Sequence, residues 1–324
     1  MRRWLLAVAV IAGAGLIVVL AVGADPWRAL AAAVASSVGS PDAVQETFAK
    51  TTPLLWCGLA VALAFRAGVW NIGAEGQLLA GATAATAVVL AVPVGPWSAP
   101  LGLLAGGLAG AAWAGIAAVL RLWRGVNEVL STILLNLIAV AGVSWAVHGP
   151  LQEAAGTYPQ SDAIPRAAWL WRPFPPGRAH LGFLLALAAA GLLTLALRRT
   201  GWGLEIRASG DAPETARVCG IRVERVQAGA LVLSGLLAGL GGAVELTGVT
   251  HRLFERFSPG WGYSGIAVAL LGGLQPGATA VAATLFGGLA AASGGLQRVA
   301  GVPTVATLLI QGLVIVVLAA GRRR

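Results

Sequence analysis

The stretch that decides the fold is GVWNIGAEGQLLAG, residues 68–81, which sets polar side chains and glycines between two apolar runs. The preceding run reads PLLWCGLAVALAF and the following one ATAATAVVLAV. Asn71 can accept hydrogen bonds from the first N–H groups of a helix, and a carboxylate at Glu75 suits the positive end of the helix dipole. Gly73 and Gly76 allow neighbouring backbones to approach closely. The stretch therefore predicts a helix that begins inside a helical bundle.

Composition places the whole chain in lipid. Of its 324 residues, 57% are hydrophobic and 11% are charged, whereas a soluble domain is about half apolar and about a quarter charged. The apolar runs are continuous, unlike the alternating segments of a membrane β-barrel. One helical crossing needs about 20 apolar residues, so the chain is long enough for about ten. We predict an all-α polytopic membrane protein with about ten transmembrane or re-entrant helices and a single transmembrane domain over residues 1–324.

Ten candidate spans follow from the apolar runs. Pro53–Gly68 and Tyr263–Leu274 are short, which is typical of the halves of a broken or re-entrant helix covered by protein or water. The first span has features of a signal peptide, but its apolar run exceeds the usual length of about 7–15 residues, so an uncleaved helix is favoured. The spans are Trp4–Val22, Pro53–Gly68, Glu75–Val92, Ser98–Leu120, Glu128–Gly149, His180–Leu197, Arg225–Thr247, Tyr263–Leu274, Gly277–Ser293 and Thr304–Ala320.

Arginines gather on one side of the membrane when these spans alternate. Both termini and the polar segment 198–225 fall on this side, which is the cytoplasm by the positive-inside rule. The segment 150–179 is then extracytoplasmic. This orientation explains the net charge of +9 without a nucleic-acid-binding surface.

Glycines recur at helical spacing in two of the spans. Gly102, Gly106 and Gly110 are four residues apart, and so are Gly235 and Gly239. Small residues at this spacing let membrane helices approach closely. We predict tight helix packing inside the protein at these positions, with a dimerisation face as the alternative.

Three polar islands interrupt the apolar chain, and the first two lie next to or within predicted spans. The first is the opening stretch, and the second is GVNEVLSTILLN, residues 125–136. Glu128, Thr132 and Asn136 are four apart and share one helix face. Such a stripe serves interhelical hydrogen bonding or lines a pathway, while the two glutamates equally suit the cytoplasmic interface. The candidate substrate-pathway residues are Asn71, Glu75, Gln77, Asn127, Glu128, Thr132 and Asn136.

A third island is RRTGWGLEIRASGDAPETARVCGIRVER, residues 198–225. Asp211 followed by Glu214 is similar to a capping box, Pro213 suits a first helical turn, and Gly220 is a natural helix end. The pattern predicts a short helix over Ala212–Cys219 on a cytoplasmic loop. An ordinary surface helix and a docking element for a soluble partner both fit it.

Four motifs in this order carry a resemblance to a known family. NIGAEGQ, NEVLSTILLN, GDAPETARVCGI and GYSGIAVALLGGLQP together resemble permease subunits of bacterial ABC importers in the branched-chain amino acid and sugar permease superfamily. The first two motifs look most like the subgroup for nucleosides and simple sugars. The resemblance runs from about Pro53 to Gly312. It implies a type II-like ABC importer permease bundle in the bacterial cytoplasmic (inner) membrane.

The resemblance also implies a function and partners. The chain would translocate a small polar solute, first a nucleoside, with ribose-like sugars or branched-chain amino acids as alternatives. It would work with a second, paralogous permease subunit, a cytoplasmic ABC ATPase and an extracytoplasmic substrate-binding lipoprotein. The segment 211–221 would be the helix that couples to the ATPase. The residues implied in this contact are Asp211, Pro213, Glu214, Ala216, Arg217, Gly220 and Ile221.

The residues themselves limit the chemistry. Lys50 is the only lysine, so the chain has no GxxxxGK[ST] phosphate loop and cannot be the ATPase. No cofactor is expected, because ATP would be bound and hydrolysed by a partner subunit. No nucleophile–base pair or metal-ligand spacing is present, which excludes a self-sufficient enzyme. Two alternatives remain: an ion-coupled secondary transporter, with Glu75 and Glu128 as the relay, and a membrane scaffold, which the polar stripe disfavours.

Overall fold

The computed structural model describes residues 2–302, 309, 312 and 313. These residues are helical or irregular, apart from one isolated β-bridge between Gln160 and Phe254. The predicted span Thr304–Ala320 lies almost wholly outside them. The elements are α1 (Arg2–Ala21), α2 (Pro26–Val38), α3 (Pro41–Arg66), α4 (Ala74–Ala91), α5 (Ser98–Arg124), α6 (Glu128–Val147), η1 (Arg166–Ala168), α7 (Leu181–Arg199), α8 (Gly201–Asp211), α9 (Pro213–Val218), α10 (Val223–Glu245), the π-helical η2 (Leu246–Thr250), α11 (Trp261–Leu271) and α12 (Pro276–Ala300).

Seven of the described helices are long and apolar enough to cross a membrane. They are α3, α4, α5, α6, α7, α10 with its extension η2, and α12. The prediction of an all-α polytopic membrane protein is therefore confirmed. By contrast, α11 has 11 residues and is about 16 Å long at 1.5 Å per residue. It is too short to cross alone, as its short apolar run predicted.

The other predicted short span, Pro53–Gly68, belongs to a longer helix, so its predicted start and its interpretation as half of a broken helix were wrong. Helix α3 begins at Pro41 and runs for 26 residues, with Pro53 buried inside it. Ser40 caps its start by accepting the Ala43 N–H at 3.1 Å, and Pro41 occupies the first turn, where no N–H is needed. A proline inside a membrane helix is tolerated where neighbouring helices pack around it. Here α2, α10, α11 and α12 all pack against α3.

Two short helices, α2 and α8, were not predicted. Asp25 caps α2 by accepting the backbone N–H groups of Trp27 and Arg28. Thr200 caps α8 by accepting the Gly203 N–H at 3.1 Å. Both helices have fewer than 14 residues, so a search for membrane-length apolar runs misses them.

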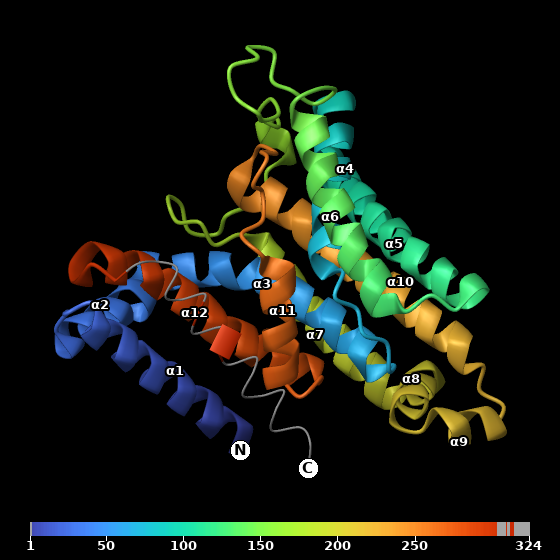
Figure 1. The fold of residues 1–324 in the computed structure, drawn as a ribbon. Helices are drawn as coiled ribbons and strands as arrows, with labels where there is room; N and C mark the ends of the chain where they lie inside the picture. Colours follow the sequence, from blue (N-terminus) through green and yellow to red (C-terminus); the bar gives the residue numbers. More distant parts are fainter. Residues whose placement is uncertain (1, 303–308, 310–311, 314–324) are drawn as a thin grey trace.

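The glycine repeats pack three helices together, as the sequence predicted. Helices α4, α5 and α10 lie side by side (Figure 1). A Cβ on Gly239 of α10 would lie 2.8 Å from the Gly110 Cα of α5 and closer still to the Gly106 carbonyl oxygen. A Cβ on Gly81 of α4 would overlap the Gly239 backbone. The backbones therefore touch directly, without side chains between them.

The connecting segments separate to opposite ends of the bundle. Helices α8 and α9 lie at one end, where α8 packs against α7, α10 and α3, and the long segment after α6 lies at the other end (Figure 1). The bundle thus has one arginine-rich end, where α3, α5 and α7 finish with Arg66, Arg124 and Arg199.

Candidate transport pathway

Two helices begin against each other inside the bundle. Glu75 lies in the first turn of α4, and its Oε2 accepts the backbone N–H of Gly262, in the first turn of α11, at 2.7 Å. A Cβ on Gly262 would overlap the backbone of Ala74 and Glu75. We call this contact, formed by residues 71–77 and 258–263, the helix junction. Its carboxylate faces the positive end of the α11 dipole.

Asn136 of α6 holds the α4 side of the junction. Its Oδ1 accepts the Gly76 N–H at 2.8 Å, and its Nδ2 donates to the Ile72 carbonyl at 2.9 Å. The same Nδ2 lies 3.2 Å from the Tyr263 hydroxyl, which accepts from it. Asn136 is 1% exposed, whereas Tyr263 is 43% exposed. One amide therefore joins the starts of α4 and α11 to α6.

Asn71 and Gln77 form a buried amide pair. Asn71 Nδ2 donates to Gln77 Oε1 at 2.9 Å, and Gln77 Nε2 donates to Asn71 Oδ1 at 3.0 Å. Asn71 Nδ2 also donates to Ser234 Oγ at 2.8 Å, and that hydroxyl donates to the Ala60 carbonyl. The pair fixes the start of α4 against α3 and α10.

The predicted cap of α4 is only partly as expected. Asn71 Oδ1 accepts the Gly73 N–H at 2.8 Å, but Gly73 is itself the N-cap residue. The first-turn N–H of Gly76 is satisfied by Asn136 instead. Asn136 of α6 therefore accepts the first-turn N–H that the sequence analysis expected Asn71 to accept. It can do so because α6 packs against the buried start of α4.

The structure brings together five of the seven predicted pathway residues. Asn71, Glu75, Gln77 and Asn136 share the contacts described above, and Thr132 lies beside Gly73, where an added Cβ would be 2.9 Å from the Thr132 Cβ. Asn127 and Glu128 make none of these contacts and lie at the start of α6, where Asn127 is exposed and Glu128 accepts the Trp70 N–H at 3.4 Å.

Glu128 belongs to a second polar network at the arginine-rich end. It pairs with Arg121 of α5 at 2.9 Å, and Arg121 donates to Gln227 of α10 at 2.6 Å. Gln227 Nε2 donates to the Ala67 carbonyl at the end of α3. Asn127 caps α6 by accepting the Val129 N–H at 2.8 Å. This network ties the ends of four helices together.

Sequence reasoning missed three contributors to these contacts. Ser234 lies in the apolar middle of its helix, with no polar residue three or four positions away. Gln227 lies outside the islands, and Tyr263 was noted only as part of a motif. For Tyr263, an aromatic hydroxyl beside two glycines at the start of a short span was an available signal.

Comparison with known proteins identifies the family. Residues 44–319 match the family described as branched-chain amino acid transport system / permease component. The chain belongs to this permease family. It is 35% identical to a glucose ABC transporter permease of Haloferax volcanii, over 94% of this chain and 83% of the relative. It is 35% identical to a guanosine ABC transporter permease of Bacillus subtilis (85% and 80% covered) and 31% identical to a nucleoside ABC transporter permease of Lactococcus lactis (88% and 81%).

The same organisms hold a second, less similar permease. The second permease of Haloferax volcanii, named as putative for glucose, is 31% identical to this chain, and the second guanosine permease of Bacillus subtilis is 28% identical. Such pairs support a second permease subunit as a partner. As an ABC transporter permease subunit, the protein is a transport component and not an enzyme. No group of three metal-ligating side chains occurs in the part of the chain that the structure describes.

The short helix α9 of this permease runs over Pro213–Val218, within the predicted range. The predicted capping box was wrong, because Asp211 ends α8 and no side chain caps α9. Asp211 lies 3.7 Å from Arg66 instead. Arg217 bonds to both Glu214 and Glu224, which ties α9 to the start of α10. Ala216 is buried, and Val218 is 88% exposed.

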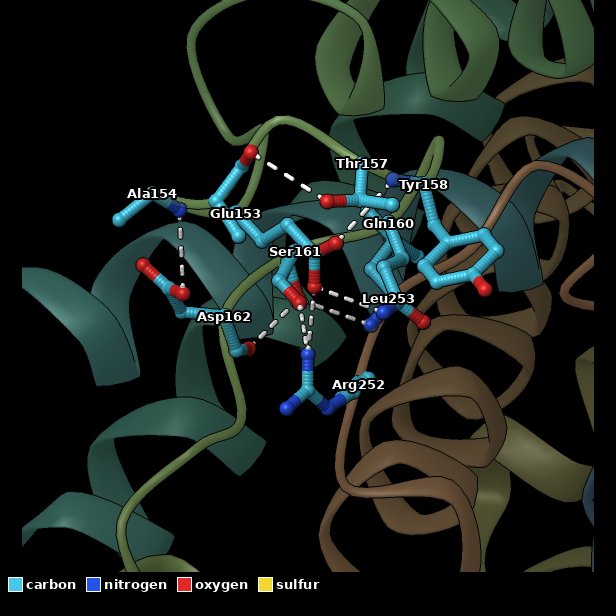
Figure 2. Close-up of polar contacts among 10 residues, drawn as sticks. Glu153, Ala154, Thr157, Tyr158, Gln160, Ser161, Asp162, Arg252 and Leu253 are labelled. Atoms are coloured by element: carbon cyan, nitrogen blue, oxygen red, sulfur yellow. Dashed lines mark hydrogen bonds and ion pairs between the residues drawn. The ribbon is translucent and has the colours of Figure 1, made fainter.

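At the other end of the permease, two segments are joined by an outer clasp, formed by Glu153, Gln160, Ser161, Arg252 and Leu253. Figure 2 shows Arg252 donating to both Glu153 Oε2, at 2.9 Å, and the Ser161 carbonyl. Ser161 and Leu253 also exchange backbone and hydroxyl bonds. The clasp holds the segment 251–260, which leads directly into α11.

Hydrogen bonds lower the pKa of Glu153, the carboxylate of the clasp. The bond from Gln160 Nε2, followed by those from the Tyr158 N–H and Arg252, holds the pKa of Glu153 below its usual range. A lowered carboxyl pKa contributes stability that is present above the pKa of the unfolded chain. This contribution is lost as the pH falls through the lowered pKa of the folded protein.

Proposed function

We propose that this permease forms, with a second permease subunit, the translocation path of an ATP-driven importer, and that the path runs past the helix junction. The main support for this proposal is that α4 and α11 both begin in the bundle interior. The Gly76 N–H there is bonded to Asn136 of α6, and the Gly262 N–H is bonded to Glu75 of α4. Transporters build solute sites from discontinuous helices of this kind. The ten-helix, type II-like bundle and the single domain over residues 1–324 remain part of this proposal.

Within this path, the residues have two roles. Asn71, Glu75, Gln77, Thr132 and Asn136 set the shape and polarity of the junction, where Tyr263 exposes its ring. Asn127 and Glu128 lie at the cytoplasmic mouth, where Asn127 caps α6 and Glu128 pairs with Arg121. The path residues that are bonded to backbone in this structure act by holding the helix starts in place.

The proposed solute is a nucleoside. The guanosine and nucleoside permeases that resemble this chain support it, and the glucose permease supports a simple sugar as the second candidate. We expect proteoliposomes that hold the complete importer to take up guanosine only with internal ATP, without competition from excess glucose. Competition by glucose but not by inosine would favour the sugar, and uptake driven by an ion gradient without ATP would contradict the importer.

We propose one partner at each end of the bundle. A cytoplasmic ABC ATPase would contact α9, and an extracytoplasmic substrate-binding lipoprotein would contact the segment 150–179 near the outer clasp. Exposed Val218 offers an apolar contact beside the Arg217 ion pairs. Together with Asp211, Pro213, Gly220 and Ile221, which shape the loop, these groups make the segment 198–225 the proposed coupling loop.

A charge reversal at Glu214 tests this coupling. Glu214→Arg removes one ion pair of Arg217 and reverses a charge on the surface proposed to contact the ATPase, so we expect ATPase co-purification to fall at least about tenfold. Insertion into the membrane should be unchanged, because Glu214 is exposed. Asp42→Arg is the control, since Asp42 is also exposed but lies in the first turn of α3, outside the proposed coupling loop. Equal ATPase association in both variants would reject the coupling assignment.

Accessibility labelling tests the proposed orientation, with both termini in the cytoplasm. Asp162 and Asp211 are both exposed. Asp162 belongs to the segment after α6 and Asp211 ends α8, and these elements lie at opposite ends of the bundle. In a chain lacking Cys57 and Cys219, we expect a membrane-impermeant maleimide to label D162C in intact cells and D211C only after permeabilisation. The opposite pattern would invert the orientation.

A further inference from the structure

A basic cavity lies at the arginine-rich end, away from the helix junction. It has a volume of about 180 Å³ and is lined by the ends of α3 and α7, by α8 and by the start of α12. Arg66, Arg198 and Arg207 come from three different helices and meet there. A buried water needs only a few tens of cubic ångströms, so the cavity is large enough for a group bigger than a single water.

The cavity carries excess positive charge. Arg66 lies 3.7 Å from Asp211, a carboxylate that is 67% exposed. Within the described part of the chain, neither Arg198 nor Arg207 makes an ion pair. The start of α12 adds its dipole, because no side chain caps this helix and Gly277 lines the cavity. Such a concentration of donors and positive charge suits a phosphate group.

An apolar groove continues from the cavity along the bundle surface. It has a volume of about 550 Å³, runs between α7 and α12, and shares Thr194, Arg198 and Gly277 with the cavity. Leu187, Ala190, Gly191 and Leu195 line its α7 wall. Both helices are of membrane-spanning length, so the groove opens toward the hydrocarbon of the bilayer.

We propose that the cavity and groove together bind one anionic phospholipid, with its phosphate among Arg66, Arg198 and Arg207 and an acyl chain between α7 and α12. A soluble phosphate would occupy the cavity but not the groove, whereas a lipid would place its phosphate in the cavity and its acyl chain in the groove. Basic pockets between membrane helices bind lipid headgroups in this way. With the proposed orientation, the lipid belongs to the cytoplasmic leaflet. The bound lipid joins α7 and α12 to α8, which is part of the proposed coupling loop. The proposal does not depend on the transported solute.

The test uses the full chain, purified in a neutral detergent and titrated with phosphatidylglycerol, while native mass spectrometry counts bound lipid. We expect one tight site in the wild type and a much weaker response to phosphatidylcholine. In the double variant Arg198→Gln/Arg207→Gln, the affinity should fall about 30-fold, which corresponds to about 1 kcal/mol for each arginine. Arg124→Gln/Arg222→Gln is the matched control, because both arginines are exposed at the same end of the bundle.

A second variant tests the groove. A Cβ on Gly191 meets no atom within 4 Å, so Gly191→Leu should fold while filling the acyl-chain path and displacing the lipid. Gly115→Leu, at an equally open position on α5, should leave binding unchanged. Wild-type affinity in the arginine double variant, or equal binding of phosphatidylcholine, would overturn the proposal. The proposal would also be overturned if inorganic phosphate protected the protein against thermal unfolding as well as phosphatidylglycerol does, and if Gly191→Leu did not change this protection. These two results would indicate a site for soluble phosphate.

Discussion

Glu75→Gln should yield a permease that inserts and assembles normally but imports its solute about tenfold more slowly. Glutamine keeps the size of the side chain and can still accept the Gly262 N–H, which Glu75 now holds at 2.7 Å. It removes the charge that faces the start of α11, a charge–dipole contact worth up to about 2 kcal/mol where partly buried. We expect the helix junction to keep its fold and to lose the electrostatic hold on α11. Initial uptake rates, normalised to the amount of assembled complex, measure this effect.

Two further variants separate the charge from the hydrogen bond. Glu75→Ala leaves the buried Gly262 N–H without an acceptor, which costs about 1–3 kcal/mol, so its thermal stability should fall below that of Glu75→Gln. Asp42→Asn removes an exposed carboxylate from the first turn of α3, outside the helix junction and the coupling loop, and should leave uptake unchanged. Normal uptake by Glu75→Gln would leave Glu75 with only a structural role at the helix start.

A side chain at Gly239 should abolish assembly of the bundle. A Cβ there meets the backbones of Gly106 and Gly110 on α5, and Gly81 of α4 packs on the same position. Overpacking of an ordinary core costs about 1–3 kcal/mol. Here no side chain can rotate away, because the contacts are backbone atoms, so the three helices must separate. We expect Gly239→Val to remove the folded species in size-exclusion chromatography of detergent extracts.

The control for Gly239→Val is a valine at a glycine that no helix approaches. Gly115 lies on α5, one of the same three helices, and a Cβ on it would meet no atom within 4 Å. Gly115→Val should therefore assemble at the wild-type level. A folded, transport-competent Gly239→Val variant would show that α5 and α10 are further apart in the membrane than this packing requires.

The sequence predicted those parts of the fold that are local patterns. Glycines four residues apart on one helix face indicate close packing wherever the partner lies, so the tight packing of α5 and α10 could be expected, but the contact of α4 with both could not. The length of an apolar run likewise indicated that α11 is too short to cross. Pro53 misled the prediction of α3, because a proline inside a helix and a proline at its start look alike without the surrounding helices.

The candidate site could be predicted only in part, because its bonds join distant residues. Glu75 and Gly262 are 187 residues apart, and Asn136 and Gly76 are 60 apart. The sequence showed that both polar islands need partners inside the bundle, but no local pattern indicates that Asn136 caps α4 or that Glu75 faces α11. The same limit applies to Glu128, whose partner Arg121 looked like one of many arginines of the cytoplasmic side.

The shortness of α11 has an electrical consequence. At about 16 Å, this helix covers roughly half of a hydrocarbon core about 30 Å thick. Leu274, just after the end of α11, lines the cavity at the arginine-rich end, so the proposed orientation places the start of α11 near mid-depth. In the proposed pathway, a solute at the helix junction has crossed about half of the membrane voltage. A solute with one charge would gain or lose about 1 kcal/mol there per 100 mV, half of the full value. An uncharged nucleoside or sugar neither gains nor loses this electrical free energy at the junction, so its import rate should be independent of membrane potential.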